Sequence, residues 1–153
     1  MITAVVAVEQ PIHLDLLYKR ISQAFTPGKV TQTVRNTVDA AISQRLQGQV
    51  VVEDCFVRMA DMSAPPVRRS PLGAPDRNIE HISIGEIAGI MEKILVGAYG
   101  MSRSVLCSEA AKVFGFERSG PKIKQRTNEA VDHLVRTGKV SDYDDKIQLL
   151  EEE

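Results

Sequence analysis

The chain has 153 residues, of which 43% are apolar and 5% aromatic, with no tryptophan and a formal net charge of −1. This length suffices for one ordinary domain or two small ones, with a core of Leu, Ile, Val and Ala. A slightly acidic chain is not expected to bind nucleic acid over its whole surface, although a local basic patch stays possible.

The sequence predicts a cytoplasmic protein with reduced cysteines. It has no apolar run of about 18 residues, which a membrane helix would need. The start, Met1-Ile2-Thr3-Ala4, lacks the basic and apolar regions of a signal peptide. Cys55 and Cys107 both lie in apolar patterns. Buried free thiols are therefore expected, with a disulfide or a reactive thiol as the alternatives.

Residues 1–61 predict a first helical repeat that ends in a hairpin. Residues 2–8 leave room for only a truncated first helix, as in a chain cut from a longer protein; a natural start at Met1 is the alternative. Two apolar stripes with helical spacing follow, Leu14, Leu17, Ile21, Ala24 and Phe25, then Val34, Val38, Ala41, Ile42 and Leu46. Gly48 precedes two short apolar runs, 50–52 and 56–57, which predict paired strands.

Residues 62–81 are expected to be a linker. Four prolines within residues 62–75 remove backbone donors and disfavour helix. We expect this segment to be extended and mobile.

Residues 82–153 predict a second repeat with a complete first helix. Ser83 and Glu86 have the spacing of a capping box, and an apolar stripe then runs from Ile84 to Ala98, with Gly97 and Gly100 expected to end the helix. A second helix is expected over 102–114. A third begins near Pro121, a residue suited to a first helical turn, and stops at Gly138. Residues 139–141 and 147–149 are expected to pair around a turn over 142–145.

The two predicted repeats align without a gap when the chain is shifted by 89 positions. Apolar residues coincide over about 45 residues, for example Leu17 with Leu106 and Phe25 with Phe114. We interpret this as an internal duplication, although two amphipathic helices would give part of the agreement by chance.

Three helices followed by a short hairpin resemble the winged-helix variant of the helix-turn-helix fold. Three segments, Glu9-Gln10-Pro11-Ile12-His13, Ile82-Ser83-Ile84-Gly85-Glu86-Ile87 and Phe114-Gly115-Phe116-Glu117-Arg118-Ser119-Gly120-Pro121-Lys122-Ile123, are similar to an uncharacterised domain family. That family lies at the C-terminal end of large bacterial proteins with a superfamily I DNA/RNA helicase motor. The resemblance implies tandem winged-helix-like repeats and a helicase motor domain as a partner. The first repeat departs from this pattern, because residues 29–34 lack the glycine and one cation of residues 118–123.

The sequence carries no motif for catalysis, a metal or a cofactor. There is no phosphate-binding Gly-x-x-x-x-Gly-Lys-Ser/Thr loop, so no ATP site is expected here. His13, His81 and His133 have no metal-ligand spacing with one another or with the cysteines. We therefore expect no enzyme activity, no metal and no cofactor.

Charge is unevenly distributed, and one basic segment is a candidate contact for nucleic acid. Residues 112–139 have a balance of +4, whereas the segment from 141 onward has a balance of −5. The candidate phosphate contacts gather at the start of the third helix, with Lys139 from the hairpin expected nearby; they are Arg118, Lys122, Lys124, Arg126 and Lys139. The alternative is a solvated helix face with ordinary charge pairs.

These observations predict a non-catalytic accessory module of a helicase-like protein that engages DNA or RNA weakly through its second repeat. The outward positions of the first repeat's third helix are uncharged: Thr33, Asn36, Ala40, Ser43 and Gln47. Such a face suits protein contact, so a docking or dimerisation module is the first alternative. A free-standing transcription regulator is the second, and Glu129 and Asp132 on the third helix disfavour it.

Overall fold

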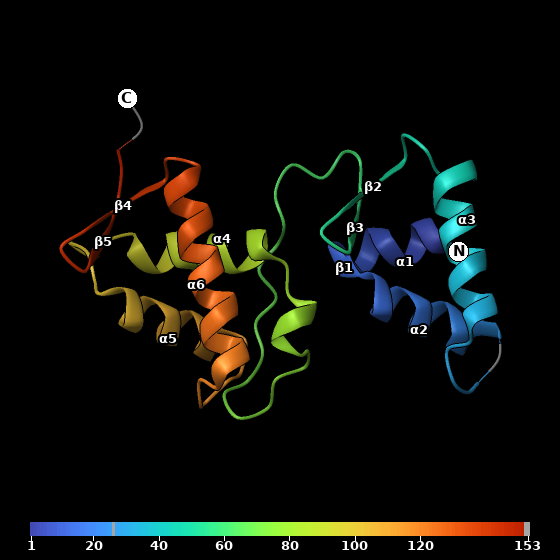
Figure 1. Cartoon of the computed structure of the whole chain (residues 1–153), viewed down its shortest axis with the longest axis horizontal. Coiled ribbons are helices and arrows are strands. Elements are labelled where there is room, and N and C mark those ends of the chain that lie inside the picture. The colour runs from blue at the N-terminus through green and yellow to red at the C-terminus, as the bar shows by residue number, and fades with distance from the viewer. Residues whose placement is uncertain (26, 152–153) are drawn as a thin grey trace. The chain divides into compact units, whose positions relative to one another are not determined.

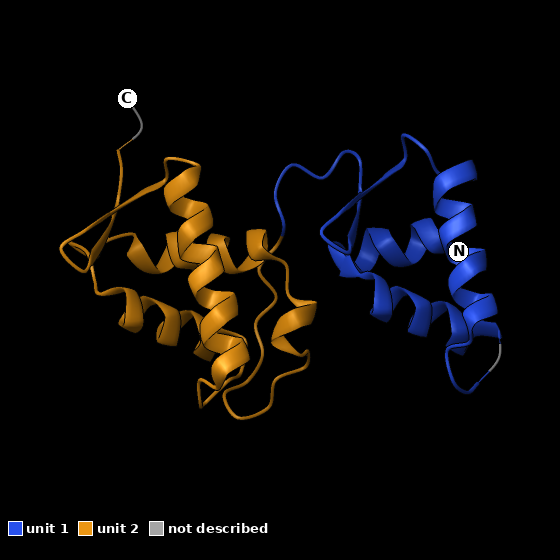
Figure 2. Ribbon diagram, viewed as in Figure 1, with its two compact units in different colours: residues 1–65 blue, residues 66–153 orange. Residues whose placement is uncertain are grey.

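The structure, a computed structural model, describes residues 1–25 and 27–151 (Figure 1). The chain divides into two compact units, Met1–Pro65 and Pro66–Glu153, called unit 1 and unit 2 below (Figure 2). Helices with short antiparallel hairpins make up the regular structure. The expectation of a mainly helical chain with short β-hairpins is confirmed. Among the described residues, no helix combines the length and apolar character needed to cross a membrane.

Unit 1 packs helices against a small three-stranded sheet. Its elements are α1 (Ile2–Glu9), β1 (Ile12–His13), α2 (Leu14–Phe25), α3 (Gln32–Arg45), β2 (Val50–Glu53) and β3 (Phe56–Met59). The sheet order is β1-β3-β2, and both pairings are antiparallel. Val50 lies opposite Met59, and Ile12 lies opposite Val57.

The core of unit 1 takes buried side chains from each of its helices and strands. Val6 of α1, Leu17 of α2, Val38 of α3 and Val57 of β3 are buried together. Phe25 was expected on the same apolar stripe but is 71% exposed. It is the last residue of α2, and the buried face of that helix ends at Ser22.

Unit 2 has a longer first helix and a two-stranded hairpin. Its elements are a short 3₁₀ helix η1 (Ile79–His81), α4 (Ile84–Leu95), α5 (Arg103–Val113), α6 (Pro121–Arg136), β4 (Val140–Tyr143) and β5 (Lys146–Leu149). Serine side chains cap α4 and α5: Ser83 Oγ accepts from the Glu86 amide, and Ser102 Oγ accepts from the Val105 amide. Fully buried residues from all three helices and the hairpin form one core; they include Ile87, Met91, Leu106, Ala110, Val131, Leu134 and Ile147.

The two units present helices and strands in the same order and at matching spacing. The helices α2 and α3 begin at residues 14 and 32, and α5 and α6 begin 89 positions later. The pairing of Ile12 with Val57 has a counterpart in Met101, whose amide and carbonyl both bond to Ile147, at 3.0 and 2.8 Å. Both hairpin turns contain two residues with positive φ, Asp54 and Cys55 in unit 1 and Asp144 and Asp145 in unit 2.

Most of the segment expected to be a linker belongs to unit 2. The boundary between the units falls between Pro65 and Pro66, not at residue 82. The segment has no strand and only the short helix η1, but its backbone bonds to unit 2, for example from the Ser70 amide to the Val113 carbonyl. These backbone hydrogen bonds attach the proline-rich segment to unit 2. They could not be predicted from its composition.

The prediction of two buried thiols is wrong for one cysteine. Cys107 on α5 is buried, and this burial raises the pKa of its thiol. Cys55 is exposed because it occupies the turn between β2 and β3, with φ at +66°. The apolar residues around it in sequence belong to the strands and not to the turn.

Candidate functional site

The N-terminus of α6 carries the largest share of the candidate phosphate contacts. Pro121 occupies its first turn, and the capping residue Gly120 offers no side-chain acceptor, so α6 begins without a side-chain cap. The side chains of Arg118, Lys122 and Lys124 are exposed around this end. Backbone N–H groups and three exposed cations thus surround one helix end, with Lys122 and Lys124 on different sides of α6 because two residues span about 200° of a helix. Such a helix end favours anions.

One acidic side chain reaches this basic group. Lys122 Nζ lies 3.2 Å from Glu80 Oε1 of η1, and both side chains are largely exposed. An ion pair exposed to this degree contributes little to stability and exchanges readily with other partners. An open pocket of about 390 Å³ lies beside the pair; its lining includes Ile79, Phe116 and Ile123.

Arg126, predicted with the same group, makes contacts inside unit 2. Its Nη2 donates to the carbonyl of Ile82 at 2.7 Å, and its Nη1 lies 3.5 Å from Glu129. The side chain is 19% exposed. These contacts tie α6 to the segment before α4, so Arg126 serves the packing of the unit.

Lys139 lies at the other end of α6. The helix has 16 residues, which corresponds to about 24 Å at 1.5 Å per residue. Figure 1 shows β4 following the far end of α6. The expectation that Lys139 lies near Lys122 is therefore wrong, because a straight helix separates them.

Arg103 binds two acidic side chains, one on α6 and one on β4, and sequence reasoning missed it. Its Nη2 lies 2.9 Å from Asp132 of α6 and 2.8 Å from Asp142 of β4, and its Nη1 donates to Asn128 Oδ1 at 3.2 Å. One guanidinium from the start of α5 thus joins α6 and the hairpin. Of the two carboxylates that disfavoured a transcription regulator, Asp132 is at least partly neutralised by Arg103, whereas Glu129 lies 3.5 Å from Arg126.

Glu86 is the most completely buried ionisable group described in unit 2. Its side chain is 0% exposed on α4. Arg77 donates to both of its oxygens at 2.8 and 2.9 Å, and the Arg68 amide and guanidinium donate at 2.9 and 3.2 Å. Burial by itself raises the pKa of the Glu86 carboxyl, but the bonds from Arg77 and Arg68 outweigh it and hold that pKa below its usual range.

The corresponding helix of unit 1, α3, presents a different surface. A shallow groove of about 480 Å³ runs along it; its lining includes Asn36, Thr37, Ala40 and Gln44. Arg35, a cation near its start, lies over the ring of Tyr18 and pairs with Asp15 at 3.2 Å. Burial and the hydrogen bond to Asp39 raise the pKa of Tyr18 to about 12. Helix α3 thus carries few cations, and one of them, Arg35, already contacts Tyr18 and Asp15.

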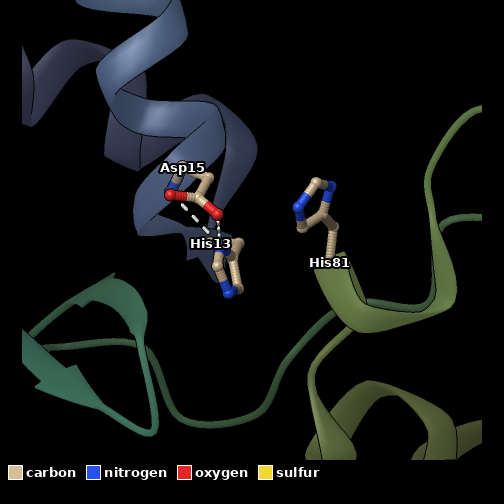
Figure 3. Close-up of side chains that lie close together, drawn as sticks. All are labelled: His13, Asp15 and His81. Carbon is tan, nitrogen blue, oxygen red and sulfur yellow. Dashed lines mark hydrogen bonds and ion pairs between the residues drawn. The ribbon is translucent and has the colours of Figure 1, made fainter. Parts of the chain in front are cut away.

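His13 has a structural role at the start of α2 (Figure 3). Its Nδ1 accepts from the Asp15 amide at 3.1 Å and lies 3.8 Å from the Asp15 carboxylate. Its ring meets Phe56 edge-on, with the centroids 5.1 Å apart. His81, the third side chain drawn in Figure 3, belongs to unit 2.

A scan against protein-family models, a search of curated proteins and a search of solved structures each found no match to this chain.

Proposed function

We propose that the chain is a tandem winged-helix-like, non-catalytic module of a helicase-like protein, and that unit 2 contacts nucleic acid through phosphates. Helix, strand, helix, helix and hairpin in unit 1, with sheet order β1-β3-β2, match the order of a winged helix. In unit 2 the Met101–Ile147 bridge takes the place of the first strand.

The observation that carries the nucleic-acid proposal is the exposed group of Arg118, Lys122 and Lys124 around the uncapped start of α6. Cations and free N–H groups at one helix end are suited to phosphate oxygens. Phosphates carry no base identity, so little sequence preference is expected. Because few cations take part, binding is weak.

Fluorescence anisotropy with a labelled short duplex and a labelled single strand tests this proposal on the full chain. Three phosphate contacts give a slope of about −2.7 for log K against log salt on duplex, or about 40-fold weaker binding from 50 to 200 mM salt. Reversal of Lys122 and Lys124 to Glu should abolish binding at low salt. Lys139→Glu should weaken binding less, because Lys139 lies at the other end of α6.

Lys29 and Arg45 of unit 1 provide the matched control, since both are exposed and carry the same charge. Their reversal to Glu changes the net charge equally but should leave binding nearly unchanged. If neither nucleic acid binds at low salt, or if both double reversals weaken binding equally, the proposed contact is wrong.

A protein-docking function is the second candidate, and the groove along α3 favours it. Its lining is mostly small and uncharged, which is typical of a surface that contacts protein rather than phosphate. In that case Ala40→Glu should disrupt association with a helicase motor domain, whereas the reversals at Lys122 and Lys124 should not.

A further inference from the structure

Residues 66–78, called the strap below, form an irregular segment with a turn at residues 72–73 and attach to the surface of unit 2. Val67 lies against α4 at Gly89, where an added Cβ would be 3.7 Å from Val67 Cγ2. The Ser70 amide then donates to the Val113 carbonyl at 3.0 Å, and the Gly73 amide donates to the Gly115 carbonyl at 2.9 Å. The strap therefore contacts α4 through Val67 and the end of α5 through Ser70 and Gly73.

The two ends of the strap meet at one carboxylate. Arg68 and Arg77 both bind Glu86, and Arg77 Nη2 also donates to the Arg68 carbonyl at 3.1 Å. A second contact joins the two sides of the strap: Ser70 Oγ is 3.0 Å from Asp76 Oδ2. The strap is thus a loop whose base is closed by Glu86.

The far end of the strap fits against a glycine. A Cβ on Gly115 would lie 2.8 Å from the Pro71 carbonyl oxygen and 2.9 Å from Pro75, and φ at this position is +93°. Only glycine admits both the backbone conformation and the close approach. The sequence at the end of α5 is therefore adapted to a docked strap.

Polar contacts dominate the attachment of the strap. Val67 packs against the core but is only partly buried, and Leu72 is 58% exposed. The buried core of unit 2 consists instead of residues from η1 to β5. Segments with few buried apolar contacts open at lower free energy than the core to which they attach.

We propose that the strap is a releasable segment latched by Glu86, and that it opens while α4, α5 and α6 stay folded. The amides of Ala60 and Met62 still bond to unit 1, so residues 63–65 connect the units when the strap is docked. Release adds residues 66–78 to this connector. Its fully extended reach then rises from about 10 Å to about 55 Å.

Native-state amide hydrogen exchange by NMR on the full chain tests the proposal. The reporters are the amides of Arg68, Ser70 and Gly73, which bond to Glu86, Val113 and Gly115. Val131, buried in α6, reports on the core. We expect the three strap amides to exchange together, slower than unstructured amides but at least tenfold faster than the Val131 amide.

Glu86→Gln should accelerate exchange of the strap amides at least tenfold more than that of Val131. Glu109→Gln is the matched control, because Glu109 makes an exposed pair with Lys112 and its loss changes the charge equally. Arg77→Gln removes the latch from the strap side and should reproduce the effect if the Glu86 variant folds poorly. The proposal is overturned if the strap amides and Val131 exchange at one rate, or if the strap amides show no protection.

Discussion

At the scale of single residues, Glu86 shows how a correct sequence signal can give an incomplete answer. Its spacing from Ser83 predicted a capping box, and Ser83 does cap the Glu86 amide. The carboxylate, however, binds Arg68 and Arg77 from the strap. Spacing along one helix cannot show that a distant segment will bury a side chain and supply its partners.

Glu86→Gln should lower the free energy of unfolding of unit 2 by about 2–3 kcal/mol at neutral pH. This value is based on the usual cost of removing one partner from a buried ion pair. We expect a smaller cost here because Arg68 is partly exposed. The folded pKa of Glu86 lies below the unfolded value of about 4.3. Its stabilisation is therefore complete above that value and is lost as the pH falls through the folded pKa.

Urea unfolding followed by the NMR signals of unit 2 at neutral and acidic pH would measure this effect. The difference between wild type and variant should shrink towards acidic pH, where both side chains are neutral. A difference that does not depend on pH would show that the carboxylate charge contributes nothing.

At the scale of elements, helix starts were predictable because they depend on local chemistry. Ser102 precedes α5, and Pro121 begins α6, as expected. The two-residue strand β1 was not predicted, since its pairing with β3 uses backbone groups that any sequence offers. The grouping of Lys139 with Lys122 failed for a different reason: a charge balance over a segment carries no information about the length of the helix between them.

The hairpin turns allow a prediction at this scale. Both turns have positive φ at two non-glycine residues, which suits the type I′ turn but strains side chains that have a Cβ. Cys55→Gly should stabilise unit 1 by about 1 kcal/mol. Asp145→Gly should stabilise unit 2 by less, because Asp tolerates this conformation better than Cys.

Gln148→Gly, in strand β5, is the control for the turn substitutions. It should destabilise unit 2 by about 0.5–1 kcal/mol, because glycine weakens a strand that needs no positive φ. Thermal unfolding of the three variants would decide. Equal effects of glycine at the turns and in the strand would contradict the turn assignment.

At the scale of the whole molecule, the two units differ in how the end of their second helix is covered. Phe114 is 1% exposed, with Arg77 of the strap 6.0 Å from its ring centroid. Phe25, at the equivalent position of unit 1, is 71% exposed. The internal repeat predicted equivalent residues from the apolar pattern. It could not predict that, among the described residues, the strap packs near Phe114 while Phe25 stays exposed. The strap therefore contributes to the stability of unit 2, even though it opens before the core does.

A comparison of fragments 66–153 and 82–153 tests this conclusion. The shorter fragment lacks Arg68 and Arg77, which leaves Glu86 buried without the partners that bind it in the structure. The expected loss is about 3 kcal/mol or more. For a domain of this size, it corresponds to a melting temperature lower by at least about 12 °C.

The Glu86→Gln substitution in both fragments distinguishes the effect of losing the ion pairs from the effect of deleting residues 66–81. In 66–153 the substitution should be destabilising, because it breaks pairs with Arg68 and Arg77. In 82–153 it should be stabilising, because it replaces an unpaired buried charge with a neutral group that costs less to bury. Opposite signs in the two fragments are the signature of a latch between strap and core. Equal melting temperatures for the two wild-type fragments, or the same sign in both, would restore a domain boundary near residue 82.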